Sequence, residues 1–202
     1  HVSTTMFMAG RKNCKKPIDE NSRAYPTNEY TRTKLAAERY LKEKAKEQGF
    51  RLAIVRFPTV YGKNPRGGSL FDFLKKLIEK ESILTRLDWP GLTGLIHVDD
   101  AAKAIFLASK LKVKPGNYET VLFYGENLTI ADICKTIYEA SGHEYKIIRL
   151  PKFFWYLTKV FRKYVHFVEP LLSHKIYNLV WRSSLIVDHV YNCKSPKTYQ
   201  LF

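Results

Sequence analysis

This sequence of 202 residues has few cysteines, no long apolar run, and no low-complexity segment or internal repeat. The three cysteines, Cys14, Cys134 and Cys193, lie far apart without metal-ligand spacing, so we expect free thiols in a reducing compartment and no metal site. No apolar stretch approaches the ~18 residues that a membrane-spanning helix needs. We therefore expect a cytoplasmic globular protein whose membrane contact, where it has one, is peripheral.

Positive charge is abundant, because 34 Lys and Arg against 19 Asp and Glu give a formal net charge of +15. Such an excess predicts attraction to an anionic ligand, an acidic membrane face or nucleic acid. Residues 144–182 hold eight basic residues and two glutamates, and the stretch 152–165 interleaves them with aromatics. The pattern predicts peripheral membrane contact through 152–182, but a solvated basic face with the rings in the core explains it as well. Since no recognised nucleic-acid motif is present, we do not expect nucleic acid as a partner.

The most informative motif is a tyrosine and a lysine four residues apart, Tyr30 and Lys34, at the start of a run of helix formers that stops near Gly49. On a helix these two side chains lie one above the other, and the ammonium would favour the phenolate form of the tyrosine. This arrangement suits a proton-transferring group. Tyr40 and Lys44 repeat the spacing, so the pair alone has low specificity.

The order of the expected elements indicates an α/β fold. A strand ends in the hydroxyl cluster Ser3-Thr4-Thr5, Thr27 or Asn28 caps the Tyr30 helix, and residues 51–57 read as a buried parallel strand. A strand, a helix and a strand in this order predict a right-handed crossover. Further along we expect the following: a helix over 69–81, an extended piece over 83–89, a strand at 95–98 running into a helix capped by Asp99 or Asp100, a strand over 118–124, a turn and cap over 125–129, a helix over 130–140, and an aromatic, basic helix over 153–165.

Together these features resemble the later part of an extended short-chain dehydrogenase/reductase, the NAD-dependent epimerase/dehydratase family. The resemblance rests on the Ser3-Thr4-Thr5 cluster, the Tyr30/Lys34 pair, Val60-Tyr61-Gly62 after a strand, and the stretch His97-Val98-Asp99-Asp100-Ala101-Ala102, which occur in the family's order and at its approximate spacings. It covers residues 1–142 with motifs and the remainder by general character.

The resemblance implies a role for each site residue. Tyr30 would be the catalytic acid/base, Lys34 would hold the nicotinamide ribose of NAD or NADP, and Thr5 would hydrogen-bond the reacting oxygen. Pro58, Thr59 and Val60 would line the nicotinamide pocket. The predicted substrate contacts are Thr4, Thr5, Phe57, Arg66 and Trp89.

Two departures from the family pattern bear on this prediction. The family's glycine-rich fingerprint for the cofactor pyrophosphate is absent from the ten glycines, so we expect a fragment of a longer protein that lacks the first strands of the sheet and alone binds no dinucleotide. Thr93 stands where many nucleotide-sugar epimerases have an arginine, which disfavours a nucleotide diphosphate and favours relatives resembling dihydroflavonol reductases and lipid-linked sugar epimerases.

We therefore predict a partial Rossmann-type parallel sheet over residues 1–142, with 63–94 contributing to a substrate lobe, and a mainly helical, basic and aromatic lobe over 143–202. The intact parent, expected to be a homodimer, would oxidise or epimerise a sugar, nucleotide-linked or lipid-linked. One alternative is a ketone or hydroxysteroid-like reductase of an apolar substrate. A second alternative is a non-catalytic binding or assembly protein with the same fold.

Overall fold

The computed structural model describes residues 1–8, 16–64, 69–157 and 191–201. The chain divides into two compact units. The first comprises His1–Asn64, Thr93–Asn127 and Val190–Phe202, and the second comprises Pro65–Leu92 and Leu128–His189. The predicted domain boundary at residue 142 stays a prediction. The contacts within the chain place residues 128–142 in the same unit as residues 65–92.

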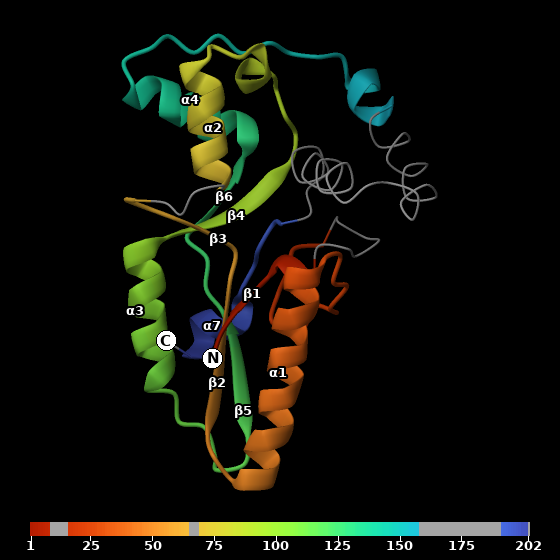
Figure 1. The fold of residues 1–202 in the computed structure, drawn as a ribbon, viewed down its shortest axis with the longest axis vertical. Helices are drawn as coiled ribbons and strands as arrows, with labels where there is room; N and C mark the ends of the chain where they lie inside the picture. Colours follow the sequence, from red (N-terminus) through yellow and green to blue (C-terminus); the bar gives the residue numbers. More distant parts are fainter. Residues whose placement is uncertain (9–15, 65–68, 158–190, 202) are drawn as a thin grey trace. The chain divides into compact units, whose positions relative to one another are not determined.

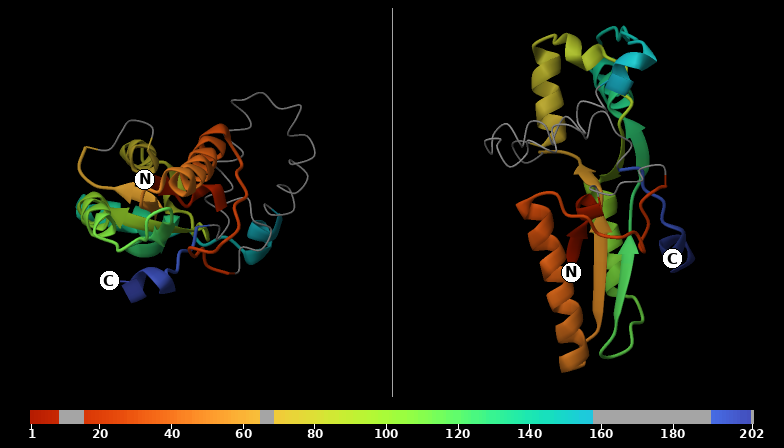
Figure 2. Two further views of the ribbon diagram at one scale, coloured as in Figure 1. Left: turned by 90° about the horizontal axis from the view of Figure 1, so that it is seen from below. Right: turned by 90° about the vertical axis from the view of Figure 1, so that its right-hand side faces the viewer.

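A parallel sheet forms the centre of the first unit, with the strand order β1 (Val2–Thr4), β2 (Leu52–Phe57), β5 (Tyr118–Leu122). Successive residues of a strand point to opposite faces. Ile54 accordingly packs in a cluster with Ala45 of α1 (Glu29–Gln48), whereas Val55 packs with the alanines of α3 (Val98–Ser109). Figures 1 and 2 show the sheet between these two helices. The predicted α/β class with a parallel sheet is confirmed.

Helix α1 begins and ends as its sequence predicts. The Asn28 side chain accepts the Thr31 N–H at 2.9 Å, and the Thr31 hydroxyl in turn accepts the Asn28 N–H at 3.1 Å, which completes a capping box. At the other end Gly49 adopts the left-handed conformation (φ 73°) that favours glycine at a helix end. The helical run expected to stop near Gly49 is therefore one continuous helix of 20 residues.

A second sheet contains β3 (Thr59–Tyr61), β4 (Leu92–His97) and β6 (Glu126–Thr129), in the order β3-β4-β6. The prediction that Asp99 or Asp100 caps α3 is wrong, because the cap is His97, whose Nδ1 accepts the Asp99 N–H at 3.3 Å. Both aspartates lie in the first turn instead, where negative charge complements the helix dipole. The turn expected over 125–129 is replaced largely by β6, and only its last residue, Thr129, serves as the predicted cap.

The described part of the second unit is mainly helical. It contains α2 (Leu70–Glu79), the short 3-10 helix η2 (Ile83–Arg86) and α4 (Ile130–Ala140), and residues 152–157 are also helical. The helices expected over 69–81 and 130–140 are confirmed, whereas the extended piece expected over 83–89 is wrong in its first half. Thr85 of η2 explains this difference, because its hydroxyl is buried and lies 2.9 Å from the Tyr138 hydroxyl of α4. Beyond residue 157, the helix predicted over 153–165 lies outside the described residues.

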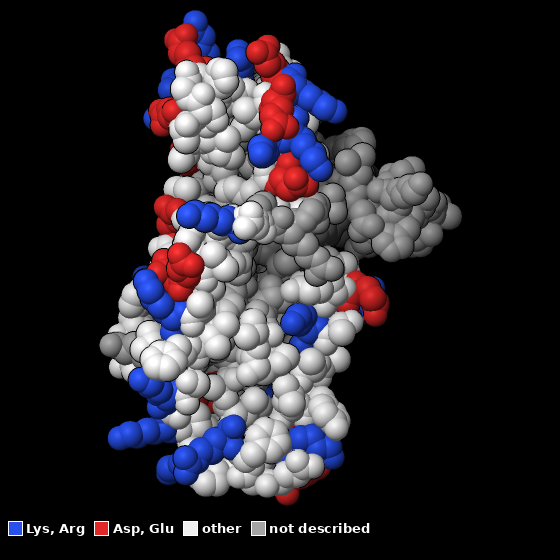
Figure 3. Space-filling view, turned by 60° about the vertical axis from the view of Figure 1, so that its left-hand side comes forward, with Lys and Arg blue, Asp and Glu red and all other residues white. Residues whose placement is uncertain are grey.

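Two small elements complete the first unit. The 3-10 helix η1 (Met6–Met8) follows β1, and helix α7 (Pro196–Leu201) packs against β5. Lys and Arg side chains gather at the lower end of the face in Figure 3, where the loop from α3 to β5 turns.

Candidate functional site

The predicted acid/base, Tyr30, is the second residue of α1, and its side chain is 51% exposed. Lys34 lies one turn later and is half-buried. Its Nζ donates to the carbonyl oxygen of Val2 in β1 at 3.3 Å. The capping box at Asn28 fixes the first turn of the helix, so the local sequence holds the tyrosine at a well-defined helix start.

Thr5 directly follows β1 and is fully buried. Its backbone N–H donates to the carbonyl oxygen of Phe57 at 2.9 Å, and its Oγ1 lies 3.4 Å from the same oxygen. The neighbouring Thr4 hydroxyl accepts the N–H of Met6 at 3.1 Å. Both predicted hydroxyls are therefore held by backbone groups at the carboxyl end of the sheet.

These residues occupy neighbouring elements of one unit, because α1 packs against β1, β2 and η1. The carboxyl ends of parallel strands are where open α/β sheets bind ligands. Contacts link Thr5 to β2 and Lys34 to β1, and Tyr30, one turn before Lys34 on α1, has an exposed side chain. Their catalytic roles stay predictions.

The predicted nicotinamide-lining segment leads from β2 into β3. Thr59 and Val60 pair with Leu95 and Ile96 of β4, and the side chain of Val60 is 44% exposed. Pro58 lies beside Gly94, where an added Cβ would come within 3.2 Å of the proline Cβ. The segment is thus held by β4, and its assignment to the cofactor stays a prediction.

The other predicted substrate contacts are placed less favourably or lie elsewhere. The Phe57 side chain is buried in the core with Val55 and the alanines of α3. Trp89 belongs to the second unit, where its Nε1 donates to the Leu84 carbonyl at 2.6 Å and its ring lies 5.2 Å from that of Trp155. Arg66 lies outside the described residues.

Thr93, at the position of the arginine found in many nucleotide-sugar epimerases, is buried and pairs with Tyr191. A charged side chain here would need a partner, because the position is buried.

Sequence reasoning missed a buried ion pair next to these residues. Arg56, the residue before Phe57, donates from Nε and Nη2 to both carboxylate oxygens of Glu38 at 3.0 and 2.7 Å. Glu38 lies one turn beyond Lys34 on α1 and is 1% exposed. Because a buried charge is costly unless paired, the pair ties α1 to β2 strongly. Glu38 lies within an unbroken run of helix-forming residues, so nothing in the sequence indicated that its side chain is buried.

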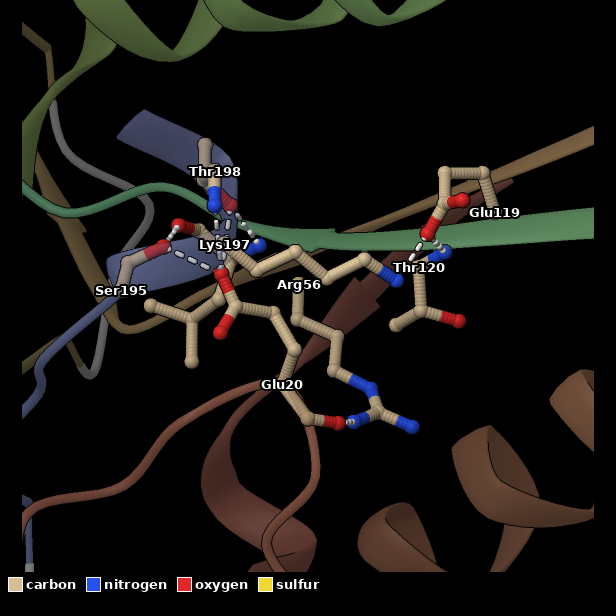
Figure 4. Close-up of polar contacts among 8 residues, drawn as sticks. Glu20, Arg56, Glu119, Thr120, Ser195, Lys197 and Thr198 are labelled. Carbon is tan, nitrogen blue, oxygen red and sulfur yellow. Dashed lines mark hydrogen bonds and ion pairs between the residues drawn. The ribbon is translucent and has the colours of Figure 1, made fainter. Parts of the chain in front are cut away.

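A second buried carboxylate, Glu20, extends this polar region to the end of the chain (Figure 4). Its backbone carbonyl accepts from Arg56 Nη1 at 2.9 Å. Its Oε1 accepts from the Ser195 hydroxyl at 2.6 Å, and from the Thr198 hydroxyl and N–H at 2.7 and 3.0 Å. These contacts join the start of α7 to the loop of Glu20, and the Leu122 N–H of β5 donates to the Thr198 hydroxyl at 3.0 Å. No sequence pattern indicated them.

Another group of titratable side chains lies at the end of β3. The Tyr61 hydroxyl donates to Glu126 at 3.4 Å, and its ring packs edge-on against that of His97 with centroids 5.3 Å apart. Partial burial, and next the carboxylate of Glu126, raise the pKa of Tyr61. A neutral phenol at this position is suited to donate hydrogen bonds and not to act as a base.

No group of three or more His, Cys, Asp or Glu within 1–8, 16–64, 69–157 and 191–201 is arranged to hold a metal ion. Over the same residues, no helix combines the length and apolar character that crossing a bilayer requires.

Comparison with known proteins identifies the group to which this chain is related. The model of the NAD dependent epimerase/dehydratase family matches residues 1–121. A putative UDP-glucose 4-epimerase of Methanocaldococcus jannaschii is 31% identical over 100 residues, covering 48% of this chain and 33% of that protein. The UDP-glucose 4-epimerase of Azospirillum brasilense is 29% identical over 147 residues, covering 63% of this chain and 42% of that protein.

Among solved structures, the UDP-glucuronic acid 4-epimerase of Bacillus cereus in complex with NAD aligns with a TM-score of 0.62 and 26% identity, over 74% of this chain and 48% of that one. The chain thus spans less than half the length of each of these relatives. The matched residues include the helix of Tyr30, the strand before Pro58 and the stretch at His97. The resemblance predicted from the sequence is therefore confirmed. This chain belongs to the NAD-dependent epimerase/dehydratase family.

Proposed function

We propose that this chain supplies the acid/base half of an NAD-dependent enzyme that epimerises or oxidises a sugar. The observation that carries the proposal is the placement of Thr5, Tyr30 and Lys34 at one end of the first unit, where β1 ends and α1 begins. Family membership supports the same reading of these three residues.

Each side chain suits its proposed role. Tyr30 takes or gives the proton of the substrate oxygen. The ammonium of Lys34, which donates to the Val2 carbonyl in this structure, would bind the ribose hydroxyls of the cofactor. Thr5 directs its hydroxyl proton toward the Phe57 carbonyl, and its lone pairs would accept a hydrogen bond from a substrate hydroxyl once this oxygen, fully buried here, is uncovered.

The cofactor proposed is NAD, which when bound would accept a hydride from the substrate carbon and return it. The donor set present fits the nicotinamide and ribose half of a dinucleotide: a cation and a phenol on one helix turn, with Pro58, Thr59 and Val60 following β2 nearby. No glycine-rich fingerprint for the pyrophosphate occurs in these 202 residues. We therefore expect this chain alone to bind no dinucleotide and to be inactive.

The substrate proposed is a nucleotide sugar, because the relatives reported above bear the names of UDP-sugar epimerases. The substrate contacts predicted from sequence, Thr4, Thr5, Phe57, Arg66 and Trp89, stay predictions. A lipid-linked sugar is the alternative favoured by Thr93, since a buried threonine offers no cation to a diphosphate.

The test is Tyr30→Phe in the intact protein, assayed with NAD and NADP against UDP-sugars, a lipid-linked sugar and an apolar ketone. We expect loss of turnover by about 10²–10⁴-fold, the usual contribution of a general acid/base. Tyr40→Phe is the matched control, because Tyr40 has a lysine at the same spacing and is 59% exposed on the same helix. Equal turnover of both variants would show that Tyr30 is not the acid/base, and no turnover by the unmodified protein on any of these substrates would favour the non-catalytic alternative.

Several further expectations for the intact protein also stay predictions: a homodimer, a cytoplasmic location, no nucleic-acid partner, and peripheral membrane contact through 152–182. Of that last segment, only residues 152–157 lie within the described residues, and they include the exposed rings of Phe153 and Tyr156.

A further inference from the structure

Helix α3 is apolar on two sides. Its inner side consists of small residues, since Ala101, Ala104 and Ala108 are buried against the sheet. Its outer side carries large residues instead, with Ile105 42% and Phe106 59% exposed. A large ring in the middle of an outward helix face is unfavourable in water, so this face is suited to be covered.

Three lysines follow this face directly. Between Lys110, Lys112 and Lys114 stand Leu111 and Val113, which are half-buried, while all three lysines are exposed. The three lysines therefore offer their side chains to solvent within one short loop between α3 and β5. The Nζ of Lys110 lies 4.1 Å from the centroid of the Phe106 ring, so basic and apolar groups are in direct contact.

Negative charge is scarce in the sequence of this segment, although Glu47, paired with Lys44, is exposed at the end of α1 against which its last turn packs. The segment 101–118 contains no Asp or Glu, and Asp100, at the other end of α3, pairs with Lys103 at 3.3 Å. The turn at Gly116 packs against the end of α1, where the Gly116 N–H donates to Phe50 and Arg51 is exposed. Figure 3 shows the blue side chains at this lower end separated by white ones.

We propose that the basic-apolar patch formed by Ile105, Phe106, Lys110, Lys112 and Lys114 docks on an anionic membrane surface. The two apolar side chains would enter the headgroup region, while the lysines contact anionic lipid. Nucleic acid fits the patch less well, because it would engage the lysines and leave Ile105 in water. The proposal does not depend on the proposed enzyme activity, and it involves residues distinct from 152–182.

The test is co-sedimentation of the full chain with vesicles of phosphatidylcholine alone or with roughly one third phosphatidylserine, a lipid that gives the negative surface on which the proposal depends. We expect binding only to the anionic vesicles, weakened by salt as the Debye length falls below ~10 Å. The triple variant K110Q/K112Q/K114Q should bind about a hundredfold more weakly, because each lysine near an anionic surface contributes about a factor of five. Phe106→Ser should reduce binding about tenfold through loss of apolar burial.

The matched control is K75Q/K135Q/K146Q, which removes the same charge from exposed lysines of the second unit and should bind within about threefold of the unmodified chain. Thermal unfolding of each variant checks that the fold persists. The proposal is overturned if anionic vesicles do not bind, if control and patch variants lose binding equally, or if only K152Q/F153S/F154S abolishes it. Binding of RNA in place of vesicles, sensitive to the same lysines, would also overturn it.

Discussion

At the scale of single residues, the buried pair of Glu38 and Arg56 carries the largest energetic consequence. Both partners are less than a tenth exposed, and the guanidinium also lies 5.0 Å above the ring of Phe7. Glu38→Gln should therefore lower the free energy of unfolding by about 3–5 kcal/mol, because it leaves a buried cation uncompensated. Urea unfolding measures this change.

The comparison for Glu38→Gln is Glu43→Gln, because Glu43 is exposed on the same helix and should change stability by less than about 0.5 kcal/mol. The double variant Glu38→Leu/Arg56→Met should recover most of the loss, since apolar replacements of a buried pair are often neutral. Equal effects of Glu38→Gln and Glu43→Gln would show that the pair contributes little.

Cys134 gives a pH-dependent prediction. Burial raises the pKa of its thiol to about 12 from 9.0, so the folded state retains this proton longer than the unfolded state. Between those values the unfolded state binds fewer protons, and the free energy of unfolding must fall as pH rises. We expect a loss of about 1.4 kcal/mol per pH unit above pH 9 that the Cys134→Ala variant does not show. Urea unfolding of both proteins from about pH 8 to about pH 11 measures the difference. Parallel dependence of the two unfolding free energies on pH would contradict the prediction.

Sequence reasoning predicted contacts between residues close together in the sequence and missed contacts between residues far apart in it. The Tyr30/Lys34 pair and the Asn28 cap could be recognised because their partners lie within one helix turn. Glu38 could not, because its burial depends on Arg56 of a neighbouring strand, and a glutamate on a helix is otherwise typical of a solvated face. The His97 cap was missed because aspartate is the commoner capping residue.

At the scale of elements, the start of α1 is the feature most closely connected to the candidate site. Asn28→Ala removes the acceptor of the Thr31 N–H and should lower the free energy of unfolding by about 1 kcal/mol. Because Tyr30 lies in this first turn, amide hydrogen exchange of residues 29–32 should accelerate as well. Asn28→Ser is the control that keeps a capping oxygen. If exchange accelerates equally in both variants, the cap does not hold the tyrosine.

The elements themselves were predicted well where their residues follow one period. Helix α1 and strand β2 show continuous helical or apolar patterns and ended at the expected glycine and proline. The segment 83–89 failed because three to four apolar residues fit a short strand and a 3-10 turn equally, and only the contact of Thr85 with Tyr138 decides between them.

At the scale of the whole chain, the last residues return to the first unit, far from their neighbours in sequence. Cys193 exchanges two hydrogen bonds with the Asn127 side chain at 2.8 and 2.9 Å, and its region approaches Gly94 closely. The sequence after residue 188 shows no pattern of its own, so this docking was not predictable. The docking depends on Glu20, which accepts from the hydroxyls of Ser195 and Thr198 more than 170 positions later in the sequence.

The last prediction tests how far this docking stabilises the fold. Ser195→Ala/Thr198→Val removes two hydroxyl donors from the buried carboxylate of Glu20 and retains the Thr198 N–H, which donates at 3.0 Å. Since a hydrogen bond to a charged group contributes about 1.5–3 kcal/mol, the free energy of unfolding should fall by about 3 kcal/mol or more. Urea unfolding measures this loss, and limited proteolysis should show earlier cleavage within 191–201.

Two further variants separate the buried carboxylate from a general effect of changing α7. Gln200→Ala alters an exposed residue of that helix and should leave stability within about 0.5 kcal/mol. Glu20→Leu added to the double variant should restore part of the loss, because it removes the buried carboxylate that has lost its two hydroxyl donors. If the triple variant is less stable than the double one, Glu20 is held mainly by other groups.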